Sequence, residues 1–366
     1  MKRVVIFSTA YAPLIGGAEI AVKELTDRLV DFEFVLITAR IRPELLREEM
    51  IGRVKVIRVG NGGRWDKLLL WWNGWKVAQA EGNFDMIWGV MASYGGLSAL
   101  RYKKKNSKVP FLLTLQEGDS FEHIYRRAFF IWPWFKQIFS RADHIQAISN
   151  YLADWAKKMG AECPVVVVPN GVSLMKLEKN YKNNSDKKII VSVSRLVEKN
   201  GLEDLIRAMA ELPENYELHI IGGGPLQKKL GSIVTELKLV NRVTFIGEIP
   251  NQELPRYYAS ADVFVRPSLS EGLGISFLEA MQQGVPLIAS SVGGIPDFLK
   301  HGETGWFCEV KNPRDIAEKI KYVLDPVNEV KVERVVKQAQ ELVVKKYSWE
   351  VVTEQMKKIF NTVCGS

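Results

Sequence analysis

Two glutamates eight residues apart, Glu271 and Glu279, are the side chains best suited to bind a polar ligand. Glu271 follows the apolar segment 262–266, which is typical of a strand, and Glu279 lies inside the helix predicted next. The loop between them contains Gly272, Leu273, Gly274 and Ile275. Glycine lets the backbone approach a ligand, and the unpaired N–H groups of a helix's first turn attract phosphate. The pattern indicates a phosphate site beside carboxylates that accept hydrogen bonds from sugar hydroxyls.

The same pair also fits a helix without any ligand, because acidic side chains near a helix N-terminus are stabilising by themselves. The complete segment 267–290 favours the first interpretation. It resembles the signature of the retaining glycosyltransferases of family 4, in which seven residues separate two glutamates. The resemblance implies that Glu271 orients hydroxyls of a donor sugar and that Glu279 binds the ribose of its nucleotide.

A glycine pair, Gly16 and Gly17, follows the first predicted strand and opens a helix. Such a pair is most often only a tight turn. Here it stands at the carboxyl end of a strand and is similar to the family's N-terminal Gly-Gly-x-Glu, which continues to Glu19 in this chain. The resemblance implies that both glycines let the backbone approach the donor.

Two cations, Arg195 and Lys199, follow the strand predicted over 189–194. A leaving diphosphate needs charge neutralisation, for which arginine offers a planar fork and lysine a point charge. Without the family resemblance, a solvated surface pair is the simpler interpretation. The family usually has lysine directly before the next glycine, where this chain has Asn200. Whether Lys199 or Asn200 faces the diphosphate stays open, and Arg195, Lys199 and Glu271 are the expected catalytic residues.

The glycine run 222–224 precedes Pro225 and contains no Gly-x-Gly-x-x-Gly, so it does not match a dinucleotide fingerprint. A nicotinamide-dependent oxidoreductase is therefore improbable. The run is similar to the family's Gly-x-Gly-Pro loop, which implies that Gly223 lies near the nucleotide. Segment 243–247 resembles the strand whose end, at Ile246, meets the base.

The sequence predicts no metal site and no cofactor. No two aspartates stand two residues apart, and no His-Glu-x-x-His occurs. The diphosphate of the substrate, a UDP or GDP sugar, is then bound by Arg195, a lysine and backbone N–H groups.

One position departs from the family pattern. The strand predicted over 111–115 leads into Gln116 and Glu117, where the family commonly has a histidine at the place of Gln116. An amide can hydrogen-bond a sugar hydroxyl but cannot carry a proton. Gln116 and Glu117 are the expected sugar contacts on this side, and His123 is a weaker candidate.

Strands and helices alternate in both halves of the chain, which predicts parallel sheets with crossover helices. The resemblance implies the GT-B architecture, two Rossmann-like doubly wound domains that face a central cleft. We expect a Rossmann-like acceptor-binding domain over 1–172 and a polar linker over 173–188. A Rossmann-like nucleotide-sugar-binding domain follows over 189–346, and a C-terminal helix over 347–366 crosses back to the first domain.

Bulk properties are those of an ordinary globular protein: 366 residues, 47% apolar and 25% charged, long enough for two domains. No apolar run approaches the ~20 residues of a membrane span, and the N-terminus has the pattern of a strand, not of a signal peptide. The three cysteines are far apart, as expected in a reducing compartment. These features favour a cytoplasmic protein.

Charge and tryptophan gather in the first half of the chain. Residues 1–170 carry 24 Lys and Arg against 17 Asp and Glu, and eight of the ten tryptophans. Segments 64–76, 101–108 and 124–141 mix basic and aromatic residues, which fits peripheral binding to an anionic cytoplasmic membrane face or, alternatively, a buried core with a charged rim. Nucleic-acid binding is disfavoured, because no recognised motif occurs and long apolar runs interrupt the basic residues.

The resulting hypothesis is a retaining, metal-independent glycosyltransferase that moves a hexose to a glycan or lipid-linked acceptor. The alternative is a non-catalytic nucleotide-sugar or glycan-binding protein of the same fold. The sugar, base, acceptor, linkage and oligomeric state do not follow from the sequence.

Overall fold

The computed structural model describes residues 1–14, 16–174 and 186–365. The chain divides into two compact units, Met1–Gly171 with Trp349–Ser366 (unit 1) and Val172–Ser348 (unit 2). The boundaries lie one and two residues from those expected at 172 and 347. Residues 175–185 of the expected linker lie outside the described residues, and Lys188 at its end already belongs to a strand.

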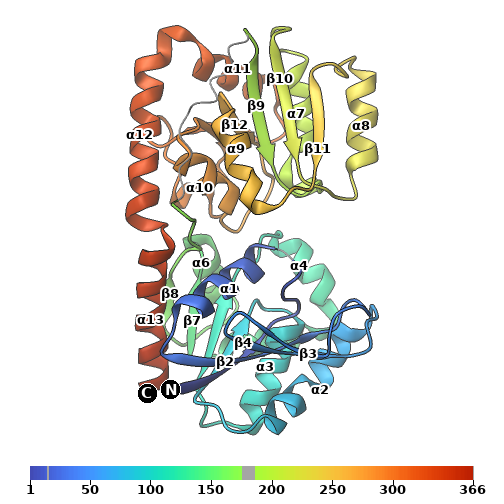
Figure 1. Ribbon diagram of the computed structural model, residues 1–366, viewed down its shortest axis with the longest axis vertical. Coiled ribbons are helices and arrows are strands. Elements are labelled where there is room, and N and C mark those ends of the chain that lie inside the picture. The colour runs from blue at the N-terminus through green and yellow to red at the C-terminus, as the bar shows by residue number, and fades with distance from the viewer. Residues whose placement is uncertain (15, 175–185, 366) are drawn as a thin grey trace. The chain divides into compact units, whose positions relative to one another are not determined.

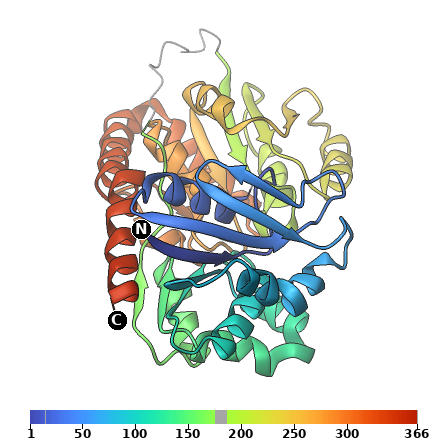
Figure 2. The ribbon, with the colours of Figure 1, turned by 60° about the horizontal axis from the view of Figure 1, so that its bottom comes forward.

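Unit 1 contains one sheet whose strands run in the order β3-β4-β2-β1-β5-β6-β7-β8 (Figure 1). Its neighbours pair in parallel except β3 with β4, and Figure 2 shows the first strands side by side. The strands are β1 (Lys2–Phe7), β2 (Phe32–Ala39), β3 (Glu48–Ile51), β4 (Val54–Val59), β5 (Met86–Val90), β6 (Phe111–Leu115), β7 (His144–Ala147) and β8 (Val165–Val167). Central strands such as β5 are buried along their whole length, as in sheets covered on both faces.

Helices cover both faces of this sheet. The helices are α1 (Gly17–Arg28), α2 (Asp66–Ala80), α3 (Tyr94–Lys105), α4 (Phe121–Ala128), the 3-10 turn η1 (Phe129–Ile131), α5 (Trp132–Ser140), α6 (Asn150–Lys158) and α13 (Trp349–Gly365). The last of them, α13, packs on the same face as α1, where the ring of Phe360 lies 5.1 Å from that of Trp88 and 5.2 Å from that of Phe32. The final helix thus completes the core of the first unit.

Unit 2 contains a parallel sheet in the order β11-β10-β9-β12-β13-β14. The strands are β9 (Lys188–Val193), β10 (Tyr216–Ile221), β11 (Val243–Gly247), β12 (Val263–Arg266), β13 (Leu287–Ser290) and β14 (Trp306–Cys308). The helices are α7 (Leu202–Met209), α8 (Gln227–Glu236), α9 (Leu254–Ala259), α10 (Ile275–Gln282), α11 (Pro313–Leu324) and α12 (Glu329–Lys346), with 3-10 turns η2 (Glu198–Asn200), η3 (Asn251–Glu253), η4 (Ile295–Asp297) and η5 (Pro326–Asn328).

Unit 2 has the doubly wound order 3-2-1-4-5-6, and unit 1 has the same order extended by β8 at one edge and by the added strand β3 at the other. The predicted fold class is therefore confirmed in each unit. In such a sheet the ligand site lies at the carboxyl ends of the strands, where the winding direction reverses. This position is next to β1 and β5 in unit 1, and next to β9 and β12 in unit 2.

Candidate functional site

The reversal point of unit 2 brings together the two loops that carry most of the predicted site. The loop after β9 holds Arg195 and Lys199, and the loop after β12 holds Glu271. The N–H of Leu269 donates to the carbonyl of Lys199 at 2.6 Å. Gly201, with φ of +66°, lies so close to the carbonyl of Pro267 that a Cβ would be 2.0 Å from the oxygen. The two loops are thus held side by side by backbone contacts.

Glu271 is anchored by a buried arginine. Its Oε2 accepts a hydrogen bond from Nη2 of Arg266 at 2.5 Å, and its Oε1 accepts from the N–H of Gly272 at 3.0 Å. The side chain of Glu271 is 14% exposed, so the carboxylate is oriented but still reachable. The carbonyl of Glu271 accepts from the N–H of Gly294, which fixes the backbone as well.

Arg266 is the residue that sequence reasoning missed. Its side chain is 5% exposed, and besides Glu271 it donates to the hydroxyl of Ser276 at 2.7 Å and to the carbonyl of Val193 at 3.1 Å. The guanidinium also lies 3.9 Å over the ring of Phe277. Burial lowers the pKa of Arg266 while the adjacent Glu271 raises it, and arginine stays charged in either case. The sequence signal for this residue is an arginine at the last position of a short apolar strand, five residues before a glutamate.

The start of α10 has the geometry expected for an anion site. Gly274 is its N-cap, with φ of +87°, and no side chain caps the helix. A Cβ at Gly274 would meet Nη2 of Arg266 at 2.7 Å, so only glycine lets the chain pass so close to the arginine. The N–H of Phe277 donates to the carbonyl of Gly274 at 3.1 Å, so the N–H groups before it in the first turn are the ones that can face a ligand.

Glu279 lies one turn further along α10 and pairs with a buried tyrosine. The hydroxyl of Tyr258 on α9 donates to its Oε2 at 2.8 Å. Burial raises the pKa of the Glu279 carboxyl and, with the carboxylate beside it, raises that of the Tyr258 hydroxyl well above its usual value. The tyrosine therefore holds one oxygen of Glu279 in place, and the other oxygen is available for a hydroxyl pair of a ligand.

The structure separates the roles of Lys199 and Asn200. Asn200 is buried, and its Nδ2 donates to the carbonyl of Arg195 at 2.7 Å, so this side chain shapes the loop. Arg195 is exposed and Lys199 is partly exposed. Of the residues predicted to meet the diphosphate, Arg195 and Lys199 therefore have solvent-accessible side chains, whereas that of Asn200 is buried.

The loop that contains Gly223 joins the same edge. The N–H of Leu196 donates to the carbonyl of Gly223 at 2.8 Å, which ties the loops after β9 and β10 together. Gly222, with φ of +124°, lies where a Cβ would be 2.1 Å from the carbonyl of Ser194. Ile246 is partly buried near the end of the neighbouring strand β11. The predicted donor-binding positions of unit 2 therefore cluster at one edge of its sheet.

In unit 1, the predicted glycines stand at the start of α1, and Ile15 before them lies outside the described residues. Gly16 is the N-cap without any capping side chain, and Gly17 is the first helical residue. A Cβ at Gly16 would meet Oε2 of Glu19 at 2.4 Å. This helix thus begins on glycine, as α7 and α10 do, whereas α4 and α6 are capped by serine hydroxyls.

Gln116 is engaged within unit 1. Its Oε1 accepts a hydrogen bond from Nδ2 of the buried Asn170 at 3.0 Å. Because of this bond the amide nitrogen of Gln116 is the group that can reach a ligand. His123 is exposed on α4, close to the serine that caps this helix.

Glu117 turns into the protein. It is 5% exposed, and its Oε1 accepts from the N–H of Ala92 at 2.5 Å, while its Oε2 is buried with no partner among the described residues. Burial, with a smaller contribution from Asp119 and against the effect of backbone N–H donors, raises the pKa of Glu117 to about 7. The bond to Ala92 supports the loop after β5, in which Met91 has a left-handed φ of 65°. Glu117 therefore supports the loop rather than presenting a charge at the surface.

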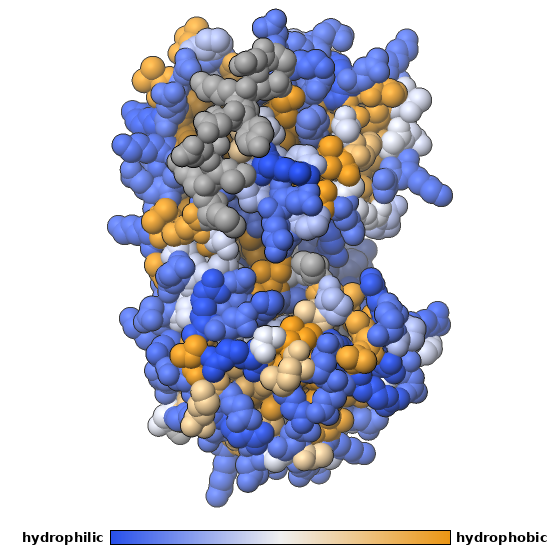
Figure 3. All heavy atoms as spheres, viewed as in Figure 1, coloured by the Kyte–Doolittle hydropathy of each residue, from blue (hydrophilic) through white to orange (hydrophobic). Residues whose placement is uncertain are grey.

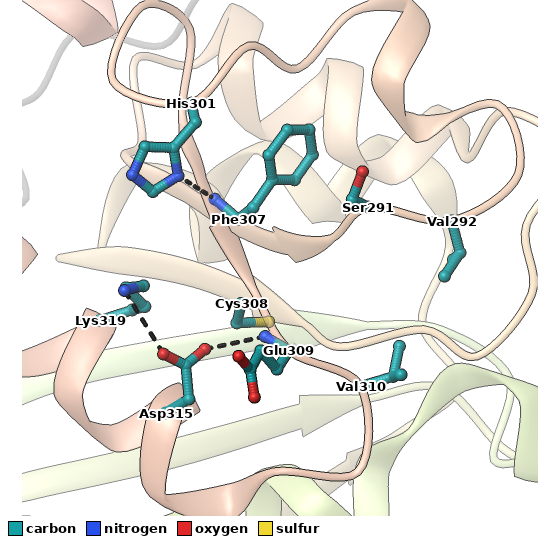
Figure 4. A pocket seen from close by; sticks show the side chains of 9 residues that line it. All are labelled: Ser291, Val292, His301, Phe307, Cys308, Glu309, Val310, Asp315 and Lys319. Carbon is teal, nitrogen blue, oxygen red and sulfur yellow. Dashed lines mark hydrogen bonds and ion pairs between the residues drawn. The ribbon is translucent and has the colours of Figure 1, made fainter.

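A separate hollow of unit 2 contains none of the predicted residues (Figure 4). It is lined by Ser291, Val292, His301, Phe307, Cys308, Glu309, Val310, Asp315 and Lys319. Its polar groups pair with one another: Nδ1 of His301 accepts from the N–H of Phe307, and Asp315 accepts from the N–H of Glu309 and pairs with Lys319. Burial lowers the pKa of His301 and so favours its neutral form.

Within ranges 1–14, 16–174 and 186–365, no three His, Cys, Asp or Glu side chains gather in a way that would hold a metal ion. The charged groups at this edge of unit 2 include the Arg266–Glu271 pair and the cations Arg195 and Lys199. The N-terminus of α10 lies in the same region. This set can bind a diphosphate and orient hydroxyl groups.

The chain matches two sequence families. Residues 175–342 match the family described as glycosyl transferases group 1, and residues 15–176 match glycosyltransferase family 4. Together the two matches extend over both units.

Three relatives illustrate the similarity. An uncharacterized glycosyltransferase of Methanocaldococcus jannaschii is 27% identical over 97% of each chain. A GDP-mannose-dependent alpha-(1-6)-phosphatidylinositol monomannoside mannosyltransferase of Mycobacterium tuberculosis is 30% identical over 52% of this chain and 54% of that one. The structure of HepE of Anabaena with UDP-glucose superimposes with a TM-score of 0.81, 18% identity and coverage of 99% and 100%. These matches confirm the predicted GT-B fold.

Proposed function

This chain belongs to the group 1 glycosyltransferases of family 4, and we propose that it transfers a hexose, such as mannose or glucose, from a UDP or GDP sugar. The acceptor is a hydroxyl of a glycan or of a lipid-linked molecule. Relatives that are named for a GDP-mannose-dependent reaction or bound to UDP-glucose support this choice of donors.

The observation that carries the proposal is the clustering of cations, carboxylates and an uncapped helix start at the reversal point of unit 2. Arg266 holds Glu271 at 2.5 Å, and the first turn of α10 lies directly after this pair. A nucleotide sugar has the two matching features, a diphosphate and several hydroxyl pairs. The N–H groups of α10 then bind the diphosphate, and the two glutamates bind hydroxyls.

Each residue has a distinct role in this proposal. Glu279 binds the ribose hydroxyls with the oxygen that Tyr258 leaves available, and Glu271 orients hydroxyls of the donor sugar. Arg195 and Lys199 neutralise the charge that develops when the diphosphate leaves. Fixed donors of this kind typically contribute about 10²–10³-fold in rate each. Gly223 and Ile246 lie beside the nucleotide, and Gly16 and Gly17 let the backbone of unit 1 approach the donor.

We propose that the reaction retains the anomeric configuration. The acceptor oxygen attacks the anomeric carbon on the face that the diphosphate vacates, the bond to the diphosphate breaks, and a diphosphate oxygen takes the acceptor proton. No carboxylate nucleophile is needed, which agrees with the engagement of Glu271 by Arg266. Charge neutralisation by Arg195, Lys199 and helix N–H groups requires no metal ion.

The acceptor lies on the side of unit 1. A lipid-linked acceptor would place the enzyme at the surface of a membrane, which the basic and aromatic side chains of this unit favour. Of the two predicted sugar contacts, Gln116 and Glu117, only Gln116 can reach a sugar, through its amide nitrogen. Glu117 is turned inward.

A panel of UDP-, GDP- and ADP-sugars tests the donor, with EDTA present throughout. We expect one donor to raise the thermal midpoint and to release nucleoside diphosphate when lipid extract or glycan is added. An NMR assignment of the anomeric proton in the product then tests retention. Failure of every nucleotide to bind would contradict the assignment of the unit 2 site, and dependence on Mg²⁺ or Mn²⁺ would contradict the metal-independent reaction.

A second candidate function is binding of a nucleotide sugar or glycan without transfer. It is favoured by Gln116, which stands where the family has a proton-carrying residue and whose oxygen is already bonded to Asn170. Stabilisation by a nucleotide sugar without turnover under every acceptor mixture would support it.

A further inference from the structure

All six exposed aromatic side chains of the described residues lie in two short stretches of unit 1. They are Trp65, Trp72, Tyr125, Phe129, Phe130 and Trp134, and the ring of Phe130 is 90% exposed. Exposed apolar side chains that cluster in one place indicate an interaction site, whereas scattered single ones do not. Figure 3 shows hydrophobic atoms interspersed with hydrophilic ones on unit 1.

Contacts join these stretches into one surface. The rings of Trp71 on α2 and Trp134 on α5 lie 6.5 Å apart. The guanidinium of Arg101 on α3 lies 4.1 Å over the ring of Trp72 and 5.3 Å over that of Trp71. Lys105 lies 5.8 Å over the ring of Trp75. We name the exposed residues of 64–76, 101–108 and 121–141 the aromatic–basic surface.

The aromatic–basic surface carries the positive charge of the whole protein. Its three segments contain twelve Lys and Arg against two Asp and Glu, a net charge of +10, whereas the complete chain has +8. One of the two acids, Asp66, is buried and accepts N–H groups of Gly62 and Gly63, and the other, Glu122, pairs with Arg126. The surface therefore attracts anions.

We propose that the aromatic–basic surface binds the headgroup region of an anionic lipid bilayer. Tryptophan and tyrosine prefer the membrane–water interface, and lysine and arginine beside them are attracted to anionic lipids. Lysine is depleted at protein–protein interfaces, whereas segment 101–108 of this surface alone contains four lysines. Throughout ranges 1–14, 16–174 and 186–365, no helix combines the length and apolar character needed to span a bilayer, so this contact is peripheral.

The proposal rests on the proposed function and specifies its acceptor. Helix α4, which belongs to the aromatic–basic surface, begins at Phe121, four residues after Glu117 and five after Gln116. The chain thus passes directly from the predicted sugar contacts of unit 1 to its exposed aromatic residues. The acceptor specified by the proposal is therefore a lipid-linked one, bound at the bilayer and glycosylated next to Gln116.

Vesicle sedimentation tests the inference with the full-length chain. Vesicles of phosphatidylcholine are compared with vesicles that contain 40% phosphatidylglycerol. We expect binding to the anionic vesicles at least tenfold tighter than to the neutral ones. We expect Lys104→Gln with Lys105→Gln to weaken it about 25-fold, since each nearby charge contributes roughly fivefold. Trp72→Ser with Phe130→Ser should weaken binding at least tenfold and reduce the blue shift of tryptophan fluorescence.

Matched controls lie on unit 2. Val327 and Val330 are 89% and 82% exposed, and their replacement by serine removes apolar surface without touching the aromatic–basic surface. Lys345→Gln with Lys346→Gln removes two charges from exposed positions there. We expect each control to change vesicle binding less than twofold. Equal losses in controls and test variants, or equal binding to both vesicle types, would overturn the proposal.

The donor assay separates this inference from the proposed function. Nucleotide-sugar binding is measured by thermal shift without vesicles, and all four variants should retain it. Absence of vesicle binding with intact nucleotide binding overturns the membrane proposal alone. Vesicle binding without any nucleotide binding overturns the donor site alone. Tight binding of a single-stranded RNA that competes with anionic vesicles would point to a nucleic-acid surface and overturn the lipid assignment.

Discussion

The carboxyl edges of the two sheets have the same strand order but opposite electrostatics. In unit 2, a buried arginine holds Glu271, and Arg195 and Lys199 lie in the adjacent loop. In unit 1, the buried carboxyl of Glu117 has a backbone N–H as its partner, and its pKa is raised to about 7. The same winding thus holds a carboxylate paired with a cation in unit 2 and a buried carboxyl that favours its neutral form in unit 1.

The difference follows from what lies next to each carboxyl. A buried carboxylate beside a guanidinium is compensated, whereas one without a cation favours its neutral form. A charged edge suits a diphosphate, and a neutral edge suits an uncharged hydroxyl acceptor. The comparison therefore agrees with the proposal that the donor binds at unit 2 and the acceptor at unit 1.

Removal of the buried cation should have the largest effect. Arg266→Ala leaves Glu271 without its partner in a site of low exposure, and we expect the free energy of unfolding to fall by about 3–5 kcal/mol. Urea denaturation measures it. Arg256→Ala, which breaks an exposed pair with Glu253, is the control and should change stability by less than about 1 kcal/mol. If Arg266→Ala and Arg256→Ala were equally stable, the buried cation would not be needed to compensate Glu271, and the two edges would not differ in this respect.

Loss of the exposed arginine should act on the reaction instead of on folding. We expect Arg195→Ala to lower kcat by about 10²–10³-fold, because charge on the leaving diphosphate is no longer neutralised. Steady-state assays of diphosphate release measure this change. Arg314→Ala removes an exposed cation from α11 and should leave kcat unchanged. A rise in KM alone would indicate that Arg195 binds the ground state.

Truncation of the second glutamate should weaken donor binding. We expect Glu279→Ala to raise the Kd of the donor by about 10–100-fold, since a hydrogen bond to a charged group contributes about 1.5–3 kcal/mol. Calorimetric titration with the nucleotide measures it, and Tyr258→Phe, which keeps the carboxylate, should have a smaller effect. Unchanged donor binding in Glu279→Ala together with unchanged kinetics in Arg195→Ala would refute the site.

The neutral edge predicts a dependence of stability on pH. The folded pKa of Glu117, about 7, lies above the unfolded value of 4.5, so the folded state holds the proton more tightly. The stability that this group contributes is fully present below pH 4.5 and is lost as the pH rises through about 7, by about 3 kcal/mol in all.

The variant Glu117→Gln tests this sign. Its amide oxygen can still accept from Ala92, and we expect it to be more stable than the wild type at pH 8 but not at pH 5. Urea midpoints across this range are the measurement, with the exposed Glu122→Gln as control. A wild-type stability that is flat from pH 5 to 8 would mean that Glu117 stays charged and that the two edges are alike.

Hydrophobic periodicity predicted both sheets because most strands are apolar along their whole length. Strand β3 gives no apolar signal in the sequence, since it begins with Glu48 and Glu49 and lies at the edge of the sheet, antiparallel to β4. Strand β14 has three residues, which is too short for a periodic signal. The aromatic segments of unit 1 were open to two interpretations, a buried core or a membrane-binding surface. Phe135 and Phe139 are buried, whereas Phe130 and Trp134 are exposed.

The site was less predictable than the fold because side-chain direction in loops depends on contacts across the sheet. The spacing of Glu271 and Glu279 located the helix start. It did not reveal that Arg266 turns inward, since a cation at the end of a strand usually points to solvent. The choice between Lys199 and Asn200 likewise depended on one hydrogen bond, from Asn200 to the carbonyl of Arg195.

The place of α13 has a consequence for biosynthesis. Unit 1 begins at Met1 but needs Trp349–Gly365, whose Trp349, Met356 and Phe360 are buried in its core. A ribosome adds about 5–20 residues per second, so the 177 residues of unit 2 delay this helix by roughly ten to thirty seconds. During that interval the nascent first unit exposes apolar surface while the second is still being made. Unit 2, formed from one continuous segment, can fold first, and the first unit to be translated is the last to be completed.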